Sequence, residues 1–460
     1  MTTSGSDHEE AAPVPEMTAR RLLRIRTVWV LPTILVSVLI MLVTLIYFGS
    51  IVDPAAHLHG LPVLVVNQDQ GADTPSGPVN LGAQTVSSFK HSSALTSRLT
   101  LQTTTLEEAH VLMDQGAAYA TVVFPTDFTR STLELAGVSP TPAGSAPQPT
   151  VEVLTNPRAG TLGVSLATGV LQPALNQASE KIGKQVLALR ATTGHADPTV
   201  RALLASPVTQ EITPYRPLPD HAGLGLSAFY LSLLTIMTGF LGATIINSGV
   251  DSALGYATSE IGPWWRLRQP LRISRWQTLL AKWAMAVFIV PFASGMMLIA
   301  AAAILQVDAP NGWLLWLYVA FASVVVAIGT LALFAALGTL GQLFALIIFV
   351  YLALASSGGT VPLQALSGFY RFTSSFEPLR QILGGVRAIL YFDAQGDAGL
   401  TRALVLTSIG LVFWLVAGTI AVRWYDRRGL DRMQPEVMAY VNRAVRAYSD
   451  EHPERTTTSR

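Results

Sequence analysis

Long uncharged apolar runs dominate the hydrophobic pattern of the chain. Six of them contain no Asp, Glu, Lys or Arg and reach, or can extend to, the roughly 20 residues that a helix needs to cross a bilayer. The pattern therefore predicts an α-helical membrane protein with six transmembrane helices. The six runs are Val28–Phe48, Leu224–Val250, Trp283–Leu305, Trp313–Leu337, Leu340–Leu354 and Ala403–Val422.

Between the first two runs, residues 50–222 alternate short apolar stretches with segments of helical periodicity, which predicts an α/β domain. A helix should begin at Thr105, because Glu108 stands three residues on and can return a hydrogen bond to the Thr105 amide. Four strands are predicted, over Leu61–Asn67, Leu99–Thr103, Tyr119–Phe124 and Val151–Leu154.

A longer helix in the same domain carries one apolar stripe. The stripe can pack on the sheet of its own domain or pair with a second protomer. We favour the first, because barely three heptads are present and coiled pairing needs a sustained repeat. The stripe consists of Leu171, Leu175, Ala178, Ile182, Val186 and Leu189.

The segment between the fifth and sixth runs, residues 356–399, is apolar and aromatic but is broken by glycines and prolines. Irregular backbone cannot face lipid, so the segment must be buried in protein or line a cavity. We predict a re-entrant hairpin of short helices that forms an outer gate, with Glu377 and Arg380 at its wetter rim. The alternative is a loop that only connects two spans. The gate residues are Gly358, Gly359, Pro362, Phe369, Tyr370, Phe372 and Pro378.

Three arginine clusters set the expected orientation in the cell membrane. Basic residues favour the cytoplasmic side, and with six spans all three clusters fall on one side. Both termini are then cytoplasmic and residues 50–222 extracytoplasmic. The clusters are Arg20, Arg21, Arg24 and Arg26; Arg266, Arg268, Arg272 and Arg275; and Arg423, Arg427, Arg428 and Arg432.

These boundaries divide the chain into five parts. Residues 1–27 are a cytoplasmic N-terminus, in which Met17–Thr27 suits an interfacial amphipathic helix or simply carries topogenic charge. Residues 28–49 are the first transmembrane helix, and residues 50–222 the outer domain. Residues 223–424 are a five-helix transmembrane domain, and residues 425–460 a cytoplasmic tail with a helix beginning at Pro435.

The cytoplasmic loop 251–277 mixes arginine with tryptophan, which favours a helix lying at the membrane interface. As the only substantial cytoplasmic loop, it is the expected docking surface for a separate ATPase. The residues of this coupling loop are Trp264, Trp265, Arg266, Arg268 and Arg272.

Composition excludes several kinds of chemistry. Half of the residues are hydrophobic, 13% are charged, and there is no cysteine, so disulfides and thiolate chemistry are excluded. The Gly183-Lys184 pair is followed by Gln185 and lacks the rest of a P-loop. His57 and His59 are interpreted as surface residues. We expect no catalytic site, cofactor, metal or nucleic-acid partner.

The predicted spans contain no Asp, Glu, Lys or Arg, which argues against an ion-coupled transporter. Lys282, at the cytoplasmic start of the third span, is expected to extend its ammonium toward water. Small and hydroxylated side chains remain, and we expect them to serve helix packing rather than substrate contact. They are Ser37, Thr44, Ser232, Thr235, Thr238, Gly239, Gly242, Ser294 and Gly295.

Three segments resemble the YhgE/Pip (phage infection protein) family, which is related to type-2 ABC transporter permeases. One is the opening strand with its Asn67-x-Asp69-x-Gly71 turn. Another is the segment with Tyr119, Ala120, Pro125 and Phe128, and the third is the Gly358-Gly359-x-x-Pro362 element. The outer domain is short for that family, so a phage-receptor role is not expected.

The resemblance implies an exporter-like permease fold, a homodimer surrounded by membrane lipids, and a possible ATPase subunit. The leading hypothesis is export of a hydrophobic, amphipathic or lipid-like substrate. The alternative is a non-transporting scaffold or receptor whose outer domain binds a protein or a cell-envelope partner.

Overall fold

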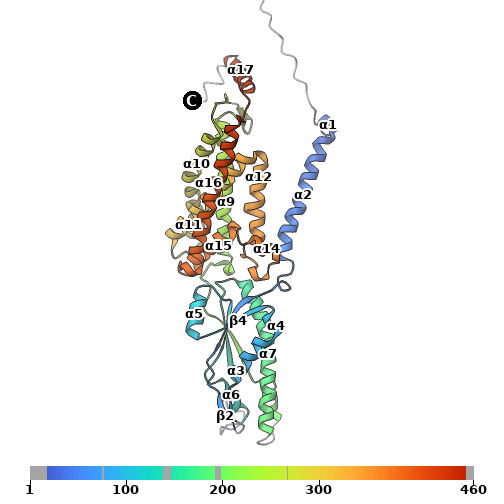
Figure 1. The fold of residues 1–460 in the computed structure, drawn as a ribbon, viewed down its shortest axis with the longest axis vertical. Coiled ribbons are helices and arrows are strands. Elements are labelled where there is room, and N and C mark those ends of the chain that lie inside the picture. The colour runs from blue at the N-terminus through green and yellow to red at the C-terminus, as the bar shows by residue number, and fades with distance from the viewer. Residues whose placement is uncertain (1–17, 75–76, 138–146, 192–197, 267, 452–460) are drawn as a thin grey trace, which may run out of the picture.

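The computed structural model describes residues 18–74, 77–137, 147–191, 198–266 and 268–451. The molecule is elongated, with an α/β domain at one end and a bundle of long helices along the rest (Figure 1). The end of the bundle opposite the α/β domain is called the far end. Helix α17 (Pro435–Glu451) lies at the far end.

The α/β domain is built on a five-stranded sheet with the order β4-β1-β5-β6-β7. Strand β1 pairs in parallel with β4 and β5, β5 pairs antiparallel with β6, and β6 pairs in parallel with β7. The strands are β1 (Leu61–Asn67), β4 (Leu99–Thr104), β5 (Ala120–Phe124), β6 (Thr150–Thr155) and β7 (Thr209–Pro214).

Both faces of this sheet are covered, which explains why its inner strands are almost continuously apolar. Leu61, Val63 and Val65 of β1 point into one core, and Leu64 and Val66 into another on the opposite face. Helices α3 (Leu81–His91), α6 (Phe128–Leu135) and α7 (Thr161–Ala191) contribute to the first core, and α5 (Leu106–Asp114) to the second (Figure 1).

The α/β prediction and its four strands are confirmed. Thr105 caps α5 by accepting a hydrogen bond from the Glu108 amide at 3.2 Å, but the Glu108 carboxylate accepts from the Thr104 hydroxyl rather than from the Thr105 amide. The stripe on α7 is buried in the core of its own domain, as favoured. Elements without a clear pattern went unpredicted: β2 (Ala72–Thr74), β3 (Gly77–Val79), α4 (Ser93–Thr96), β7 and α8 (Pro198–Leu203).

Within the described residues, six helices are long and apolar enough to cross a membrane, as predicted. Both ends of each helix lie within a few residues of the predicted ends, with two exceptions. The third helix begins earlier, at Arg275, and the sixth is longer at both ends, from Gly396 to Arg427. The helices are α2 (Arg26–Ile51), α9 (Ser227–Ala253), α10 (Arg275–Leu298) with η2 (Ile299–Ile304), α11 (Gly312–Leu337), α12 (Thr339–Leu346) with η3 (Ile347–Leu352) and α13 (Ala353–Ser356), and η5 (Gly396–Leu400) with α16 (Thr401–Arg427).

Helix α11 forms the centre of the bundle and packs against α9, α10 and α16. A Cβ added to Gly239 would lie 2.4 Å from the Ser323 carbonyl oxygen, so α9 and α11 approach closely only because this residue is glycine. The Ser323 hydroxyl donates to the Thr235 carbonyl at 2.9 Å. The hydroxyls of Ser232 and Thr235 bond to carbonyls of their own helix. The small residues of α9 therefore serve packing, as expected.

The outward surface of the bundle is apolar. Phe288 is 80% exposed and Ile304 73% exposed, as suits helices that face lipid. Helix α2 stands apart from the bundle (Figure 1) and contacts it mainly through η3 and α13. The side chains Ile46 and Ile51 of α2 reach the core of the α/β domain.

The segment after α13 contains short helices, as predicted: η4 (Leu363–Ala365), α14 (Gly368–Thr373) and α15 (Pro378–Tyr391). They are wedged between the domain and the bundle. Val361, Leu366 and Tyr370 join the core of the α/β domain, while Ile382 and Val386 of α15 join the core of the bundle.

One helical prediction is wrong, and one expected helix is shorter than the segment that suited it. The loop 251–277 contains an antiparallel pair, β8 (Ser259–Ile261) and β9 (Trp264–Arg266), because Gly262 and Pro263 between them form a turn that no helix can accommodate. The expected helix over Met17–Thr27 shrinks to α1 (Ala19–Leu22), which ends before α2 begins at Arg26. Met17 lies outside the described residues.

Candidate functional site

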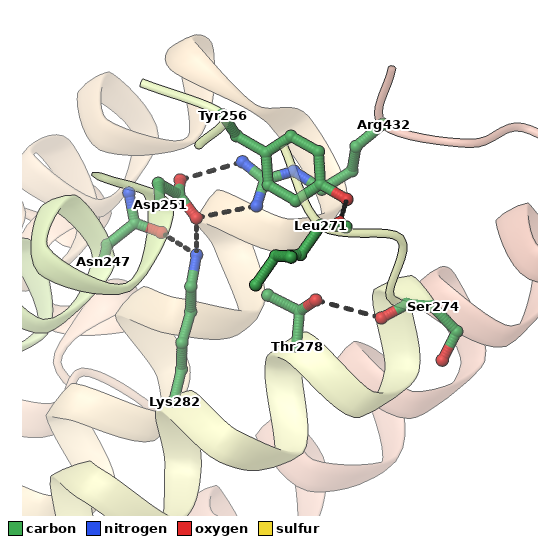
Figure 2. Close-up of polar contacts among 8 residues, drawn as sticks. All are labelled: Asn247, Asp251, Tyr256, Leu271, Ser274, Thr278, Lys282 and Arg432. Atoms are coloured by element: carbon green, nitrogen blue, oxygen red, sulfur yellow. Dashed lines mark hydrogen bonds and ion pairs between the residues drawn. The ribbon is translucent and has the colours of Figure 1, made fainter. Parts of the chain in front are cut away.

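The far end of the bundle holds a cluster of charged side chains around Asp251 (Figure 2). Asp251 Oδ1 accepts hydrogen bonds from Lys282 Nζ at 2.6 Å and from Arg432 Nη1 at 2.7 Å. Asp251 Oδ2 accepts from Arg432 Nη2 at 2.8 Å, so the arginine holds the carboxylate with both arms. Asn247 Oδ1 accepts a further hydrogen bond from Lys282 at 2.7 Å.

Helical spacing explains how these groups meet. Asn247 and Asp251 are four residues apart on α9, so they share one face of that helix. Lys282 lies on the facing side of α10, whose first turn is capped by Ser274. One carboxylate and one amide oxygen therefore converge on a single ammonium.

The expectation that Lys282 extends toward water is wrong. Its side chain is only 7% exposed, and that of Asp251 12%. The ammonium turns inward because Asp251 and Asn247 supply a closer set of acceptors than the solvent does. The two helices run past the uncharged runs from which the spans were predicted, and so carry these charges into the bundle.

Arg432 reaches the cluster because the chain folds back after α16. Asp426, near the end of α16, accepts hydrogen bonds from the backbone amides of Arg275 and Trp276, both at 3.0 Å, and thereby caps α10. The Arg275 guanidinium donates to the Leu430 carbonyl at 2.7 Å. The hydrogen bonds to Asp251 raise the pKa of Arg432 above its ordinary value, so this residue stays charged.

The loop 251–277 is fixed to the same cluster. The Arg432 guanidinium lies over the ring of Tyr256, 4.9 Å from its centre, and the Tyr256 hydroxyl donates to the Leu271 carbonyl at 2.7 Å (Figure 2). The Leu271 amide donates to the Leu254 carbonyl at 3.1 Å. The loop, the root of α9 and the tail therefore form one packed unit.

A hollow of about 310 Å³ lies beside the cluster. Three basic side chains and one carboxylate line it, together with hydroxyl and amide groups. The polar and charged lining residues are Thr244, Asn247, Ser248, Asp251, Arg275, Thr278, Lys282, Thr339, Gln342 and Arg432.

The predicted coupling-loop residues lie in and after the β8–β9 pair. The backbone of Trp264, Trp265 and Arg266 forms β9, and their side chains lie outside the described part of the structure. Arg268 and Arg272 are exposed, and Arg272 lines a second hollow against Met438 of α17. Of the two described side chains, neither that of Arg268 nor that of Arg272 bonds to Asp251, whose partners are Lys282 and Arg432.

The predicted gate residues are divided between buried and exposed positions. Tyr370 is 8% exposed and donates its hydroxyl to the Leu45 carbonyl at 2.9 Å, whereas Phe369 and Phe372 are 60% and 69% exposed. Tyr370 therefore packs inward, whereas Phe369 and Phe372 face outward.

The other gate residues hold the hairpin in place. A Cβ added to Gly359 would lie 2.1 Å from the ring of Phe229, so the hairpin meets α9 without room for a side chain. Gly358 has a positive φ of 72°. Pro362 lines a hollow of about 20 Å³, which has room for roughly one water. Pro378 occupies the first turn of α15.

Glu377 is buried at 1% exposure rather than placed at a wetter rim. Its carboxylate caps α15 by accepting hydrogen bonds from the amides of Leu379 and Arg380, at 2.7 and 2.9 Å. Burial nevertheless raises the pKa of Glu377 to about 7. Arg380 lies close by and donates to the Ser374 carbonyl at 3.0 Å.

Two arginines that the sequence did not single out hold the hairpin, Arg387 from within it and Arg158 from the domain. Arg387 of α15 donates to the Gly359 carbonyl at 3.2 Å, and burial lowers its pKa. Arg158 of the domain donates to the Tyr391 carbonyl of α15 at 3.1 Å. Its position as the only charged residue in the apolar stretch 382–391 was the available signal for Arg387.

Comparisons with known proteins give two findings. A family model described as "Protein of unknown function (DUF3533)" matches residues 32–415. A crystal structure of a domain of a candidate ABC type-2 transporter from Thermotoga maritima MSB8 is similar at 17% identity, covering 36% of this chain and 97% of that one. Its TM-score is 0.23, so this likeness carries no argument about fold or function. No curated protein matches the chain.

Proposed function

Since this chain belongs to the DUF3533 family of proteins of unknown function, we propose a function from its own residues: a membrane permease of the type-2 exporter kind. In this proposal it moves a hydrophobic, amphipathic or lipid-like substrate outward across the cell membrane. It acts as a homodimer, and a separate ATPase supplies the energy. The far end of the bundle faces the cytoplasm and the α/β domain lies outside.

The observation that supports this proposal best is the attachment of the loop 251–277. Asp251 at its root is bound to α10 through Lys282 and to the tail through Arg432. A force applied to this loop by a partner would therefore be passed to α9 and α10 together, since charge-assisted hydrogen bonds fix the geometry of the elements that they join. A loop with this role needs such a rigid attachment.

A transport assay tests the proposal. Inverted membrane vesicles from cells that express the chain should take up a fluorescent short-chain phospholipid when ATP is added, and vesicles without the chain should not. The double variant Arg268→Glu with Arg272→Glu reverses two exposed charges of the loop and should abolish uptake. The matched variant Arg443→Glu with Arg446→Glu changes the same charges on α17 and should retain it.

Equal uptake with and without the chain, across short-chain lipids of different headgroups, would overturn the permease proposal. Orientation is checked separately in the cysteine-free chain. Single cysteines at Ser97 and Arg446, both exposed, should react with an impermeant maleimide from opposite sides of the membrane. Reaction from the same side would overturn the orientation.

One observation favours the second candidate, a scaffold or receptor. The α/β domain shares a single core with the hairpin residues Val361, Leu366 and Tyr370, so a partner bound to the domain would act directly on the membrane part. Deleting the gene of the domain's outer partner should then abolish the cellular function of the chain, whereas deleting the gene of an ATPase should not. Retained uptake in purified, reconstituted protein with an ATPase would exclude this candidate.

A further inference from the structure

The hollow at the far end carries an excess of positive charge. Arg275, Lys282 and Arg432 line it against the single carboxylate of Asp251, which leaves a formal net charge of +2 on its walls. Charges in buried places are normally balanced, because transfer from water is costly for an unpaired ion. Asp426 is not among the residues that line the hollow, and its carboxylate caps α10 through the backbone amides of Arg275 and Trp276.

The residues that line the hollow include hydrogen-bond donors without a partner among the described residues. An ammonium has three N–H donors, and that of Lys282 has two partners, Asp251 and Asn247. Ser248, Thr339 and Gln342 also line the hollow, and within the described part of the chain none of them makes a side-chain hydrogen bond. These groups together can surround an anion with charged and neutral donors.

The mouth of the hollow is polar, but its surroundings are not. Ser248, Thr339 and Gln342 are exposed. Close to them on the same helices, Ile245 is 72% exposed and Leu340 61% exposed. A polar opening flanked by outward apolar side chains matches a ligand that has an anionic head and apolar chains.

We propose that this hollow binds one phosphate-bearing anionic group, supplied by an anionic lipid headgroup or by free phosphate. The Lys282 ammonium contacts the phosphate oxygens, with Arg275 and Arg432 adding positive charge and the mouth residues adding hydroxyl and amide donors. A volume of about 310 Å³ holds such a group with its headgroup alcohol. This inference does not rest on the proposed permease function, because it concerns what the hollow holds and not what is moved.

The test uses the purified full-length chain in a non-ionic detergent. The probes are dihexanoylphosphatidylglycerol, dihexanoylphosphatidylcholine and inorganic phosphate, and the readouts are the dissociation constant and the shift in melting temperature. We expect the anionic lipid to bind and the zwitterionic lipid to bind at least about tenfold more weakly. Competition by inorganic phosphate identifies a free-anion site, and its absence a site for the lipid headgroup.

Two variants and a control locate the binding. Lys282→Gln removes the charge but leaves Asp251 paired with Arg432, and it should weaken binding about tenfold or more. Ser248→Phe fills the mouth from an exposed position, so it tests the site even where Lys282→Gln does not fold. Arg428→Gln removes an exposed charge at the same end, where the guanidinium lies over Trp424, and should change the affinity less than about twofold.

Equal binding of the two lipids would overturn the proposal, since it would show that charge plays no part. Unchanged affinity in both Lys282→Gln and Ser248→Phe would also overturn it. Loss of binding in Arg428→Gln as large as that in Lys282→Gln would mean a general surface attraction in place of this hollow.

Discussion

Arg432 binds both carboxylate oxygens of Asp251, at 2.7 and 2.8 Å, across 181 residues of sequence. A bidentate pair of this kind fixes the relative direction of its partners as well as their distance. It joins the tail that follows the last long helix to the end of α9.

Replacing Asp251 by Ala should strongly destabilise the protein. The change leaves two cations, Lys282 and Arg432, without their shared carboxylate, and breaking a buried pair from one side costs about 3–5 kcal/mol. The melting temperature in detergent should fall by several degrees. Asp431→Ala is the control, because Asp431 is exposed at the same end, and it should change stability by less than about 0.5 kcal/mol. Equal effects of the two would show that the cluster contributes nothing.

Replacing Arg432 by Ala should release the tail without unfolding the bundle. Asp251 keeps Lys282 as its partner, but α17 loses the attachment of the segment that precedes it. Amide hydrogen exchange in residues 435–451 should therefore accelerate, while exchange in α11 stays unchanged. Arg446→Ala, on the exposed face of α17, should leave both rates as they are. Unchanged exchange in Arg432→Ala would mean that other contacts hold the tail.

Replacing Gly359 by Ala should destabilise the junction between the hairpin and α9. The new Cβ would lie 2.1 Å from the ring of Phe229, and overpacking of this kind costs about 1–3 kcal/mol. Combining the change with Phe229→Leu should recover part of the loss. Gly368→Ala is the control, since no heavy atom lies within 4 Å of its added Cβ. A melting temperature for Gly359→Ala equal to that of the control would contradict the close contact.

The sequence alone was sufficient to predict features that depend on neighbouring residues within one helix or strand. Uncharged runs predicted six spans because a bilayer-crossing helix must be apolar over its length. The run LPVLVVN predicted β1 because a strand buried on both faces is apolar throughout. The capping role of Thr105 was likewise a local property of neighbouring residues.

The candidate site could not be predicted in the same way, because it depends on residues far apart. Asp251 lies near the end of α9 and Lys282 two turns into α10, both just beyond the uncharged runs, and nothing local shows that they face each other. Arg432 joins them only because Gly429, at a φ of 66°, lets the chain turn back after α16. The loop 251–277 was expected to be helical because it is rich in arginine and tryptophan. That expectation did not take into account the two-residue turn at Gly262 and Pro263.

Glu377 should make stability depend on pH. Its pKa in the folded protein is about 7, against an ordinary value of 4.5, so the folded chain keeps this proton to higher pH than the unfolded chain does. The free energy of unfolding should therefore fall as the pH rises from about 4.5 to about 7, by up to about 3 kcal/mol, and stay level above.

The measurement is the melting temperature of the protein across this pH range, compared with that of Glu377→Gln. Glutamine stays neutral, so the variant should match the parent near pH 4.5 and exceed it near pH 8. Glu436→Gln is the control, because Glu436 is exposed on α17, and its curve should follow the parent. Parallel curves for the parent and Glu377→Gln would show that Glu377 titrates as an ordinary carboxyl.

Phe369 and Phe372 are 60% and 69% exposed in this chain, although they belong to a segment packed between the domain and the bundle. Two large apolar rings on one short helix need an apolar surrounding, which lipid or a second copy of the chain would provide. We therefore expect them to lie out of contact with water.

Cysteine labelling separates this expectation from an ordinary exposed loop, since the chain has no native cysteine. In intact membranes, a cysteine replacing Phe369 should resist a bulky, membrane-impermeant maleimide. A cysteine replacing Gln395, which is exposed beyond α15, should react readily from the side of the α/β domain. A small permeant maleimide should label both, which shows that each cysteine is reactive. Rapid reaction of both with the impermeant reagent would place the hairpin in water, and its role as an outer gate would then be excluded.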